Sequence, residues 1–196
     1  MTTLECQNCG QRQAYQIGGS AACATCPNGW LEPTYDYVAF KQAVASGALA
    51  ARPRSLWRYA DVLPVPAPAN PLQVGWTPLH HARRYGAKVG HAHIYIKDER
   101  YGPTNSFKDR QAALAVAAMN AGGIGECVIA STGNAAVAYA AACAAAGIKL
   151  WVFMTSMVPE AKLREAALFG AEVIKVSGNY DQTKQIAADF AQTRGL

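Results

Sequence analysis

The 196-residue sequence has no hydrophobic run long enough to cross a bilayer. Its first ten residues, MTTLECQNCG, are polar and do not resemble a secretory signal peptide. The alanine-rich stretch at 135–146 is too short and too weakly hydrophobic to span a membrane. These absences predict a soluble chain that stays in the cytoplasm and has no membrane partner.

The sequence also lacks a strong excess of charge of either sign. Its 18 basic and 13 acidic side chains give a net charge of +5. Such a mild balance suits an anionic small molecule and is too diffuse to predict nucleic-acid binding. Residues 1–33 contain a single basic side chain, Arg12, which argues against a nucleic-acid adaptor in that segment. We therefore expect a small-molecule partner and no nucleic acid.

Cysteine is scarce except near the N-terminus, where four of the six cysteines form two C-x-x-C pairs with thirteen residues between them. Two such pairs can present four thiolates to one zinc ion, and a segment this short has little core of its own. The alternatives are an iron site or two disulfides, and disulfides require an oxidising compartment. The spacing predicts a structural zinc site in a zinc-ribbon-like segment at residues 1–33. Its ligands would be Cys6, Cys9, Cys23 and Cys26.

Residues 34–78 differ in composition from the segments on either side. A helix is predicted over 37–45, and six of the ten prolines then fall between Pro53 and Pro78. This proline density excludes a regular helix or a central strand. It predicts an extended arm that wraps over the surface of the next unit.

From residue 79 onward, strand and helix patterns alternate with short connections. After a short helix at 79–85, strands are predicted at 93–99, 126–131, 149–154 and 171–177, and helices at 107–121, 134–146, 159–168 and 180–192. Such alternation is typical of right-handed crossovers. The fold class predicted for 79–196 is therefore α/β, with a parallel sheet that has helices on both faces.

The stretch PTNSFKDRQAALAVAAMNAGG, at 103–123, contains a lysine near a helix start. Ser106 can cap this helix, and Asp109 completes a capping-box-like S-x-x-D. Lys108 then occupies about the second helical position, where the helix dipole disfavours an ammonium and favours the neutral, nucleophilic amine. The alternative is a solvent-exposed lysine paired with Asp109.

A second polar stretch lies between a predicted strand and a predicted helix. It consists of Ser131, Thr132, Gly133 and Asn134. Open parallel sheets bind ligands at the carboxyl ends of their strands, and free amides at a helix start suit a carboxylate or phosphate. A plain helix N-cap explains the same four residues.

These two stretches carry a family resemblance. PTNSFKDR at 103–110, followed by ASTGNAA at 130–136, resembles the pyridoxal-phosphate enzymes of the tryptophan synthase β structural class, fold type II. Within that class, the form SFKDR, GWTPL at 75–79, IKDE at 96–99 and the N-terminal cysteines together resemble the threonine synthases. The resemblance covers nearly the whole chain and corresponds to the N-terminal portion of such an enzyme.

The resemblance implies a lyase with pyridoxal 5'-phosphate as cofactor. Lys108 would form the Schiff base with the cofactor and carry protons, and Asn134 would contact the cofactor's ring hydroxyl oxygen. The turn from Ser131 to Asn134, with Thr132 and Gly133, would hold the carboxylate of an amino-acid substrate. For a threonine synthase, that substrate is O-phospho-L-homoserine, which reacts with water to give L-threonine and phosphate. Other members of the class act as threonine or serine dehydratases or as cysteate or cysteine synthases, and these stay open as alternatives.

The sequence departs from the family pattern in two ways. Asn105 stands where the family most often has glycine, although asparagine tolerates left-handed backbone angles. No stretch fits the family's glycine-rich loop for the cofactor phosphate or its partner for the pyridine nitrogen. We therefore expect the lysine-bearing half of a longer enzyme, which would be a homodimer when complete. A truncated chain without catalytic activity is the alternative.

Overall fold

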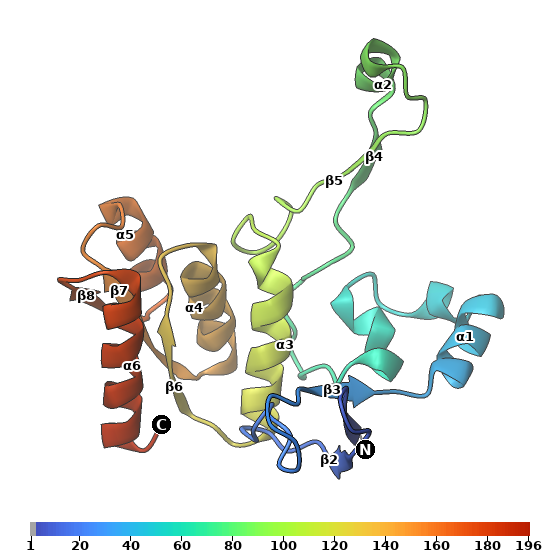
Figure 1. The fold of residues 1–196 in the computed structure, drawn as a ribbon. Helices are drawn as coiled ribbons and strands as arrows, with labels where there is room; N and C mark the ends of the chain where they lie inside the picture. The colour runs from blue at the N-terminus through green and yellow to red at the C-terminus, as the bar shows by residue number, and fades with distance from the viewer. Residues whose placement is uncertain (1–2) are drawn as a thin grey trace.

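The computed structural model describes residues 3–196 and contains a parallel sheet at its C-terminal side (Figure 1). The sheet has the strand order β6–β7–β8, formed by Glu126–Ala130, Lys149–Thr155 and Glu172–Val176. Both strand pairs are parallel, and the crossovers between them are the helices α4, Asn134–Ala146, and α5, Glu160–Leu168. The α/β class with a parallel sheet is therefore confirmed.

Helices cover both faces of this sheet, as the sequence predicts. Along the central strand β7, Leu150, Val152 and Met154 face the cluster that contains α4 residues. Phe153 points to the other face, where it packs with Val176 and with residues of helix α6, Tyr180–Arg194. Because successive side chains of a strand alternate between its two faces, one apolar strand is buried by both helix layers.

Helix α3, Lys108–Ala121, lies beside α4 and runs in the same direction (Figure 1). Their contact is made largely by alanines that are almost fully buried. These are Ala112 of α3 and Ala136 and Ala140 of α4. Small side chains let two helix backbones approach closely, so the starts of α3 and α4 are held at the same end of the molecule.

The N-terminal segment forms an antiparallel sheet of order β2–β1–β3, from Arg12–Ala14, Thr3–Cys6 and Leu31–Thr34. It lies at the end of α3 that is far from Lys108 (Figure 1). Ile17 is close enough to Gly122 that a Cβ added there would lie 2.9 Å from its methyl group. The N-terminal segment therefore contacts the C-terminal end of α3.

Residues 37–78 connect this sheet to the core. They comprise α1, Tyr37–Ala45, and two 3₁₀ helices, η1, Ala48–Ala51, and η2, Leu56–Val62. Trp57 and Val65 of the proline-rich stretch pack on Ala117 and Ala118 of α3. The part of this segment from Trp57 to Val65 therefore packs against α3.

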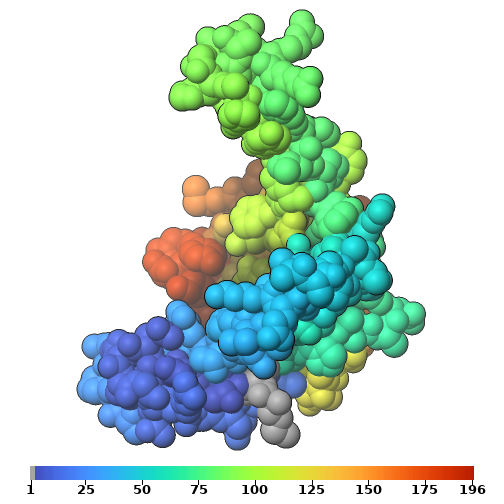
Figure 2. Space-filling view, turned by 90° about the vertical axis from the view of Figure 1, so that its right-hand side faces the viewer, coloured from blue at the N-terminus to red at the C-terminus, as the bar shows by residue number. Residues whose placement is uncertain are grey.

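The sequence prediction for residues 79–99 is wrong in two respects. Residues 79–81 form strand β4, Leu79–His81, and the helix that follows is α2, Arg83–Val89. Strand β5, Tyr95–Lys97, pairs antiparallel with β4 and takes no part in the parallel sheet. The hairpin projects away from the body (Figures 1 and 2). The residues of β4 and β5 are all exposed. Because neither face of these strands is buried, no apolar pattern directs β5 to pair with the parallel sheet.

Within the described residues, no helix is both long enough and apolar enough to cross a membrane.

Candidate functional site

Helix α3 begins at Lys108. Lys108 is therefore the first helical residue, whereas the sequence predicts it to be about the second. The Ser106 hydroxyl accepts a hydrogen bond from the Lys108 backbone N–H at 3.2 Å, so it does contribute to the helix start. The capping box is wrong, however. The buried Asp109 carboxylate accepts from the backbone N–H of Thr104, at 3.0 Å, and from the Thr104 hydroxyl. Asp109 therefore fixes the loop before the helix instead of capping it.

This loop depends on two backbone features. A Cβ added at Gly102 would lie 2.1 Å from Asp109 Oδ2, so only glycine leaves room for the carboxylate. Asn105 has a φ of 55°, in the left-handed region, which confirms the expectation that asparagine replaces glycine there. Gly102 and Asn105 thus allow the compact loop that leads into the first turn of α3.

The Lys108 ammonium is not engaged by a carboxylate. Among residues 3–196, its recorded contact is with the Phe107 ring, 5.0 Å from Nζ to the ring centre, and no hydrogen bond or ion pair is formed. Pairing with Asp109, the alternative from the sequence, does not occur because Thr104 occupies that carboxylate. The amine is left available to a ligand.

A network of side-chain hydrogen bonds joins the base of the β4–β5 hairpin to α3. Arg110 donates two hydrogen bonds to Glu99, at 2.7 and 2.8 Å, and the Thr77 hydroxyl donates to Glu99 at 2.7 Å. The Arg110 guanidinium lowers the pKa of Glu99 to about 2. Three stretches that are separated in the sequence, GWTPL, IKDE and SFKDR, therefore meet in one hydrogen-bonded group. Its Arg110 lies two residues after Lys108.

The turn from Ser131 to Asn134 lies at the end of the molecule where α3 begins, because α3 and α4 run side by side in the same direction (Figure 1). The Ser131 N–H donates to the Phe153 carbonyl at 3.1 Å, and the Ser131 hydroxyl accepts from the Gly133 N–H at 3.4 Å. Thr132 is exposed. Gly133 is the N-cap of α4 and offers no side-chain cap, so the start of α4 is open to an anion.

Asn134 is the first residue of α4, and its side chain meets a residue that sequence reasoning missed. Lys162 of α5 donates to Asn134 Oδ1 at 3.1 Å and to Glu165 at 2.8 Å. The signal that could have found it is topological, since α5 also begins beyond the carboxyl end of a parallel strand.

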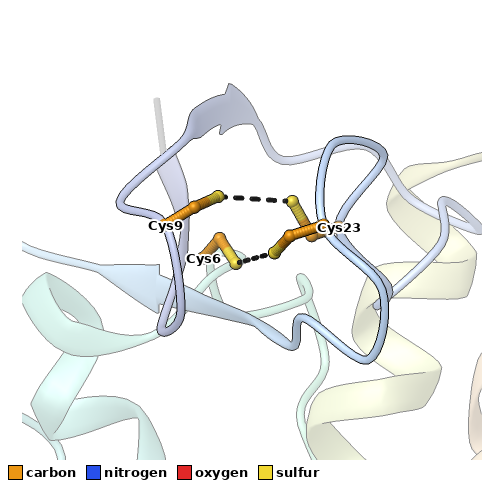
Figure 3. Close-up of side chains that lie close together, drawn as sticks. Cys6, Cys9 and Cys23 are labelled. Atoms are coloured by element: carbon orange, nitrogen blue, oxygen red, sulfur yellow. Dashed lines mark hydrogen bonds between the residues drawn. The ribbon is translucent and has the colours of Figure 1, made fainter.

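The four N-terminal cysteines come together as the sequence predicts. Their sulfur atoms all lie within 4.8 Å of one another, with Cys6 and Cys26 at 3.5 Å and Cys9 and Cys23 at 3.7 Å (Figure 3). Four sulfurs at tetrahedral angles around zinc would be about 3.8 Å apart, given a zinc–sulfur distance of about 2.3 Å. The donor set therefore fits a zinc ion.

The backbone around these thiols is fitted closely to them. A Cβ added at Gly29 would lie 2.4 Å from the Cys26 sulfur and 2.9 Å from the Cys6 sulfur. The hydroxyl and backbone amide of Thr25 lower the pKa of Cys23 to about 6, which favours the thiolate that a metal requires. Hydrogen bonding to Cys6 raises the pKa of Cys26 to about 12.

The cysteine cluster and Lys108 lie at opposite ends of α3 (Figure 1). A helix of 14 residues is about 20 Å long. A metal held by the cysteines is therefore too far from Lys108 to take part in chemistry there.

Comparison with known proteins places most of the chain in one family. Residues 71–196 match the model of a family described as pyridoxal-phosphate dependent enzyme. The chain belongs to this family. The matched range includes Lys108, the turn from Ser131 to Asn134, and Lys162.

Curated relatives of this chain are named threonine synthase. The protein from Methanocaldococcus jannaschii is 33% identical over 192 residues, which cover 96% of this chain and 47% of the relative. The protein from Methanosarcina acetivorans is 34% identical over 182 residues, which cover 92% of this chain and 44% of the relative. The chain thus spans about half the length of the curated relatives it matches.

Two solved structures share part of the fold. A pyridoxal 5'-phosphate-dependent aspartate racemase is 30% identical with a TM-score of 0.56, covering 61% of this chain and 38% of the racemase. Diaminopropionate ammonia lyase of Escherichia coli, in its apo form, is 25% identical with a TM-score of 0.57, again covering 61% and 38%. The fold therefore occurs with several different reactions.

Proposed function

We propose that this chain carries the cofactor-binding lysine of a pyridoxal-phosphate-dependent lyase of the threonine synthase type. The observation that carries the proposal is the Lys108 amine, which has no ion-pair partner among the described residues and lies at the start of α3, on the same end as the start of α4. A lysine amine that is not held in an ion pair is available to react with a carbonyl carbon. The family match to 71–196 supports the assignment.

The residues at this end fit the cofactor and an amino-acid substrate. The Lys108 amine suits an aldehyde, the Asn134 amide suits the ring hydroxyl oxygen, and the open start of α4 suits a substrate carboxylate. When bound, pyridoxal phosphate supplies an electron sink for a carbanion at the substrate α carbon.

In the proposed mechanism, the protein supplies proton transfer and orientation. With the cofactor held by this site, Lys108 Nζ would accept the proton from the substrate α carbon and deliver it to a neighbouring carbon. Ser131, which is anchored to the Phe153 carbonyl, keeps the turn from 131 to 134 in place while the substrate carboxylate is held. The fixed carboxylate restricts which bond at the α carbon is broken.

We propose O-phospho-L-homoserine and water as the substrates, with L-threonine and phosphate as the products. The names of the relatives from Methanocaldococcus jannaschii and Methanosarcina acetivorans support this choice. The dehydratase and cysteate or cysteine synthase alternatives are separated from it by a substrate panel. Release of phosphate from O-phospho-L-homoserine identifies the proposed reaction, whereas keto-acid formation from L-threonine or L-serine identifies a dehydratase.

The test of the lysine is reductive trapping. The 196-residue chain is incubated with pyridoxal phosphate, reduced with borohydride and mapped by peptide mass spectrometry. We expect one pyridoxyl adduct on Lys108, lost in Lys108→Ala and retained in Lys184→Ala, a matched removal of an exposed helical lysine. An adduct distributed over surface lysines, or one retained in Lys108→Ala, contradicts the proposal.

We propose that Cys6, Cys9, Cys23 and Cys26 hold a structural zinc ion. Four thiolates fill a tetrahedral shell and leave no position for a substrate, so the metal stabilises the ribbon. The distances between the sulfur atoms and the close approach of Gly29 support the proposal.

A further inference from the structure

Lys162 lies in a position that is electrostatically unfavourable for a lysine. It is the third residue of α5, whose N-cap, Pro159, offers no side-chain capping hydrogen bond. Its ammonium also reaches the first residue of α4, a second helix start without a side-chain cap. The first turn of a helix disfavours a positive charge, so neither helix is stabilised by this ammonium.

The ion pair with Glu165 does not account for the position. Lys162 and Glu165 are three residues apart on the helix surface and each is more than a third exposed. Pairs of this kind contribute little to helix stability, and the order with lysine before glutamate is the less favourable one. The contact with Asn134 spans 28 residues of sequence and joins α5 to α4.

The chemistry of the two groups fixes how Asn134 is oriented. An ammonium has three donors and no acceptor, so it can pair only with the oxygen of a side-chain amide. The Asn134 Oδ1 is therefore the atom turned toward Lys162, at 3.1 Å. The Asn134 NH₂ group, which only donates, is left as the free end of the amide. Because no other side-chain hydrogen bond of Asn134 is recorded within residues 3–196, Lys162 is what restrains it.

We propose that Lys162 is a positioning residue that orients the Asn134 amide so that its NH₂ donor faces an acceptor oxygen of the cofactor ring. The inference rests on the proposed function, since Asn134 contacts the cofactor there. Glu165, hydrogen-bonded to the same ammonium at 2.8 Å, holds the lysine in place. The contact also ties α5 to α4 beside the open start of α4.

The first test needs no cofactor. In the 196-residue chain with labelled asparagine side chains, the Asn134 NH₂ signal is assigned by its loss in Asn134→Asp. We expect a side chain restrained in the wild type, averaged among rotamers in Lys162→Met, and restored in Lys162→Arg, which keeps the donors. Lys184→Met removes an equivalent exposed charge from α6 and leaves the Asn134 signal unchanged. An equally restrained Asn134 in Lys162→Met overturns the inference.

The second test reads the same contact with pyridoxal phosphate bound. We expect the pH midpoint of the visible absorbance of lysine-bound cofactor to rise by about half a unit to one unit in Lys162→Met, because the ring oxygen loses an oriented donor. Lys162→Arg retains the wild-type midpoint. An unchanged midpoint in Lys162→Met sinks the positioning role while the proposed function stands. Absence of the absorbance in the wild type refutes the proposed function, and the inference with it.

Discussion

In the first turn of α3, two of three consecutive charged residues have a hydrogen-bond partner for the charged group and one does not. Arg110 is bound by Glu99 through two hydrogen bonds, and Asp109 is buried against Thr104. Lys108, which precedes them, has no such partner among the described residues. These two pairs hold the backbone of the first turn in place. The Lys108 amine is thus carried by a fixed backbone and has no carboxylate partner among the described residues.

The Glu99 to Arg110 pair predicts a pH-dependent contribution to stability. Glu99 has its pKa lowered from 4.5 to about 2 by the Arg110 hydrogen bonds. Because the native state favours the ionised form, the contribution is fully present above pH 4.5 and is lost as the pH falls toward about 2. We expect Glu99→Gln to lower the free energy of unfolding at neutral pH by about 1 kcal/mol, since solvent screens this partly exposed pair.

Urea unfolding of the wild type and Glu99→Gln at a series of pH values measures this contribution. The difference between them should narrow as the pH falls through the range from 4.5 to about 2. Glu172→Gln, on an exposed position of β8 with no ion pair recorded in the described structure, serves as control and should give a small, pH-independent difference. A gap for Glu99→Gln that stays constant with pH would show that the ion pair does not contribute.

At the scale of elements, the contact between α3 and α4 depends on the small size of alanine. Ala140 is 1% exposed and belongs to the cluster that contains Ala112 and Val116 of α3. We expect Ala140→Leu to destabilise the chain by about 1–3 kcal/mol, because the added carbons force the helices apart. Ala144→Leu, on the exposed side of the same helix, should change stability by less than about 0.5 kcal/mol. Urea midpoints measure both, and equal losses would show that the packing of α3 on α4 is not the cause.

The elements that sequence reasoning predicted well are those whose patterns are local. Helix α4 begins and ends where predicted, at 134 and 146, because a polar turn precedes it and Gly147, in a left-handed conformation, follows it. Strands β6, β7 and β8 were recognised from short apolar runs between helices. The pairing of β5 was not predictable, because a three-residue strand carries no mark of whether its partner is β4 or a strand of the parallel sheet.

The same distinction applies to the site. The convergence of the four cysteines is predictable because two C-x-x-C pairs at this spacing are typical of a metal site, and their sulfurs do converge. Lys162 was missed because its contact with Asn134 depends on how α5 is placed against α4. Asp109 was misassigned because S-x-x-D has the same letters whether its carboxylate caps the helix or binds Thr104.

At the scale of the whole molecule, α3 separates two chemically different ends. The cysteine cluster is seated at its C-terminal end through Ile17 and Gly122, and Lys108 lies at its start, about 20 Å away. The main core cluster, which joins α3, α4 and the parallel sheet, contains no residue of the N-terminal segment 3–34. If this segment holds a metal, its removal should therefore disorder the segment without disturbing the other end of α3.

This separation predicts the outcome of zinc removal. We expect the wild type and Cys127→Ser, which alters a cysteine outside the cluster, to bind one zinc ion per chain, and Cys9→Ser to lose most of it. With zinc removed by a chelator, amide hydrogen exchange should become fast in residues 3–34 and stay slow in α3 and α4, because the N-terminal segment has only a small core of its own.

The yield of the borohydride-trapped adduct on Lys108 should not change. A fall in that yield when zinc is removed would mean that the two ends are coupled along α3, and unchanged exchange in residues 3–34 would mean that the cluster folds without a metal.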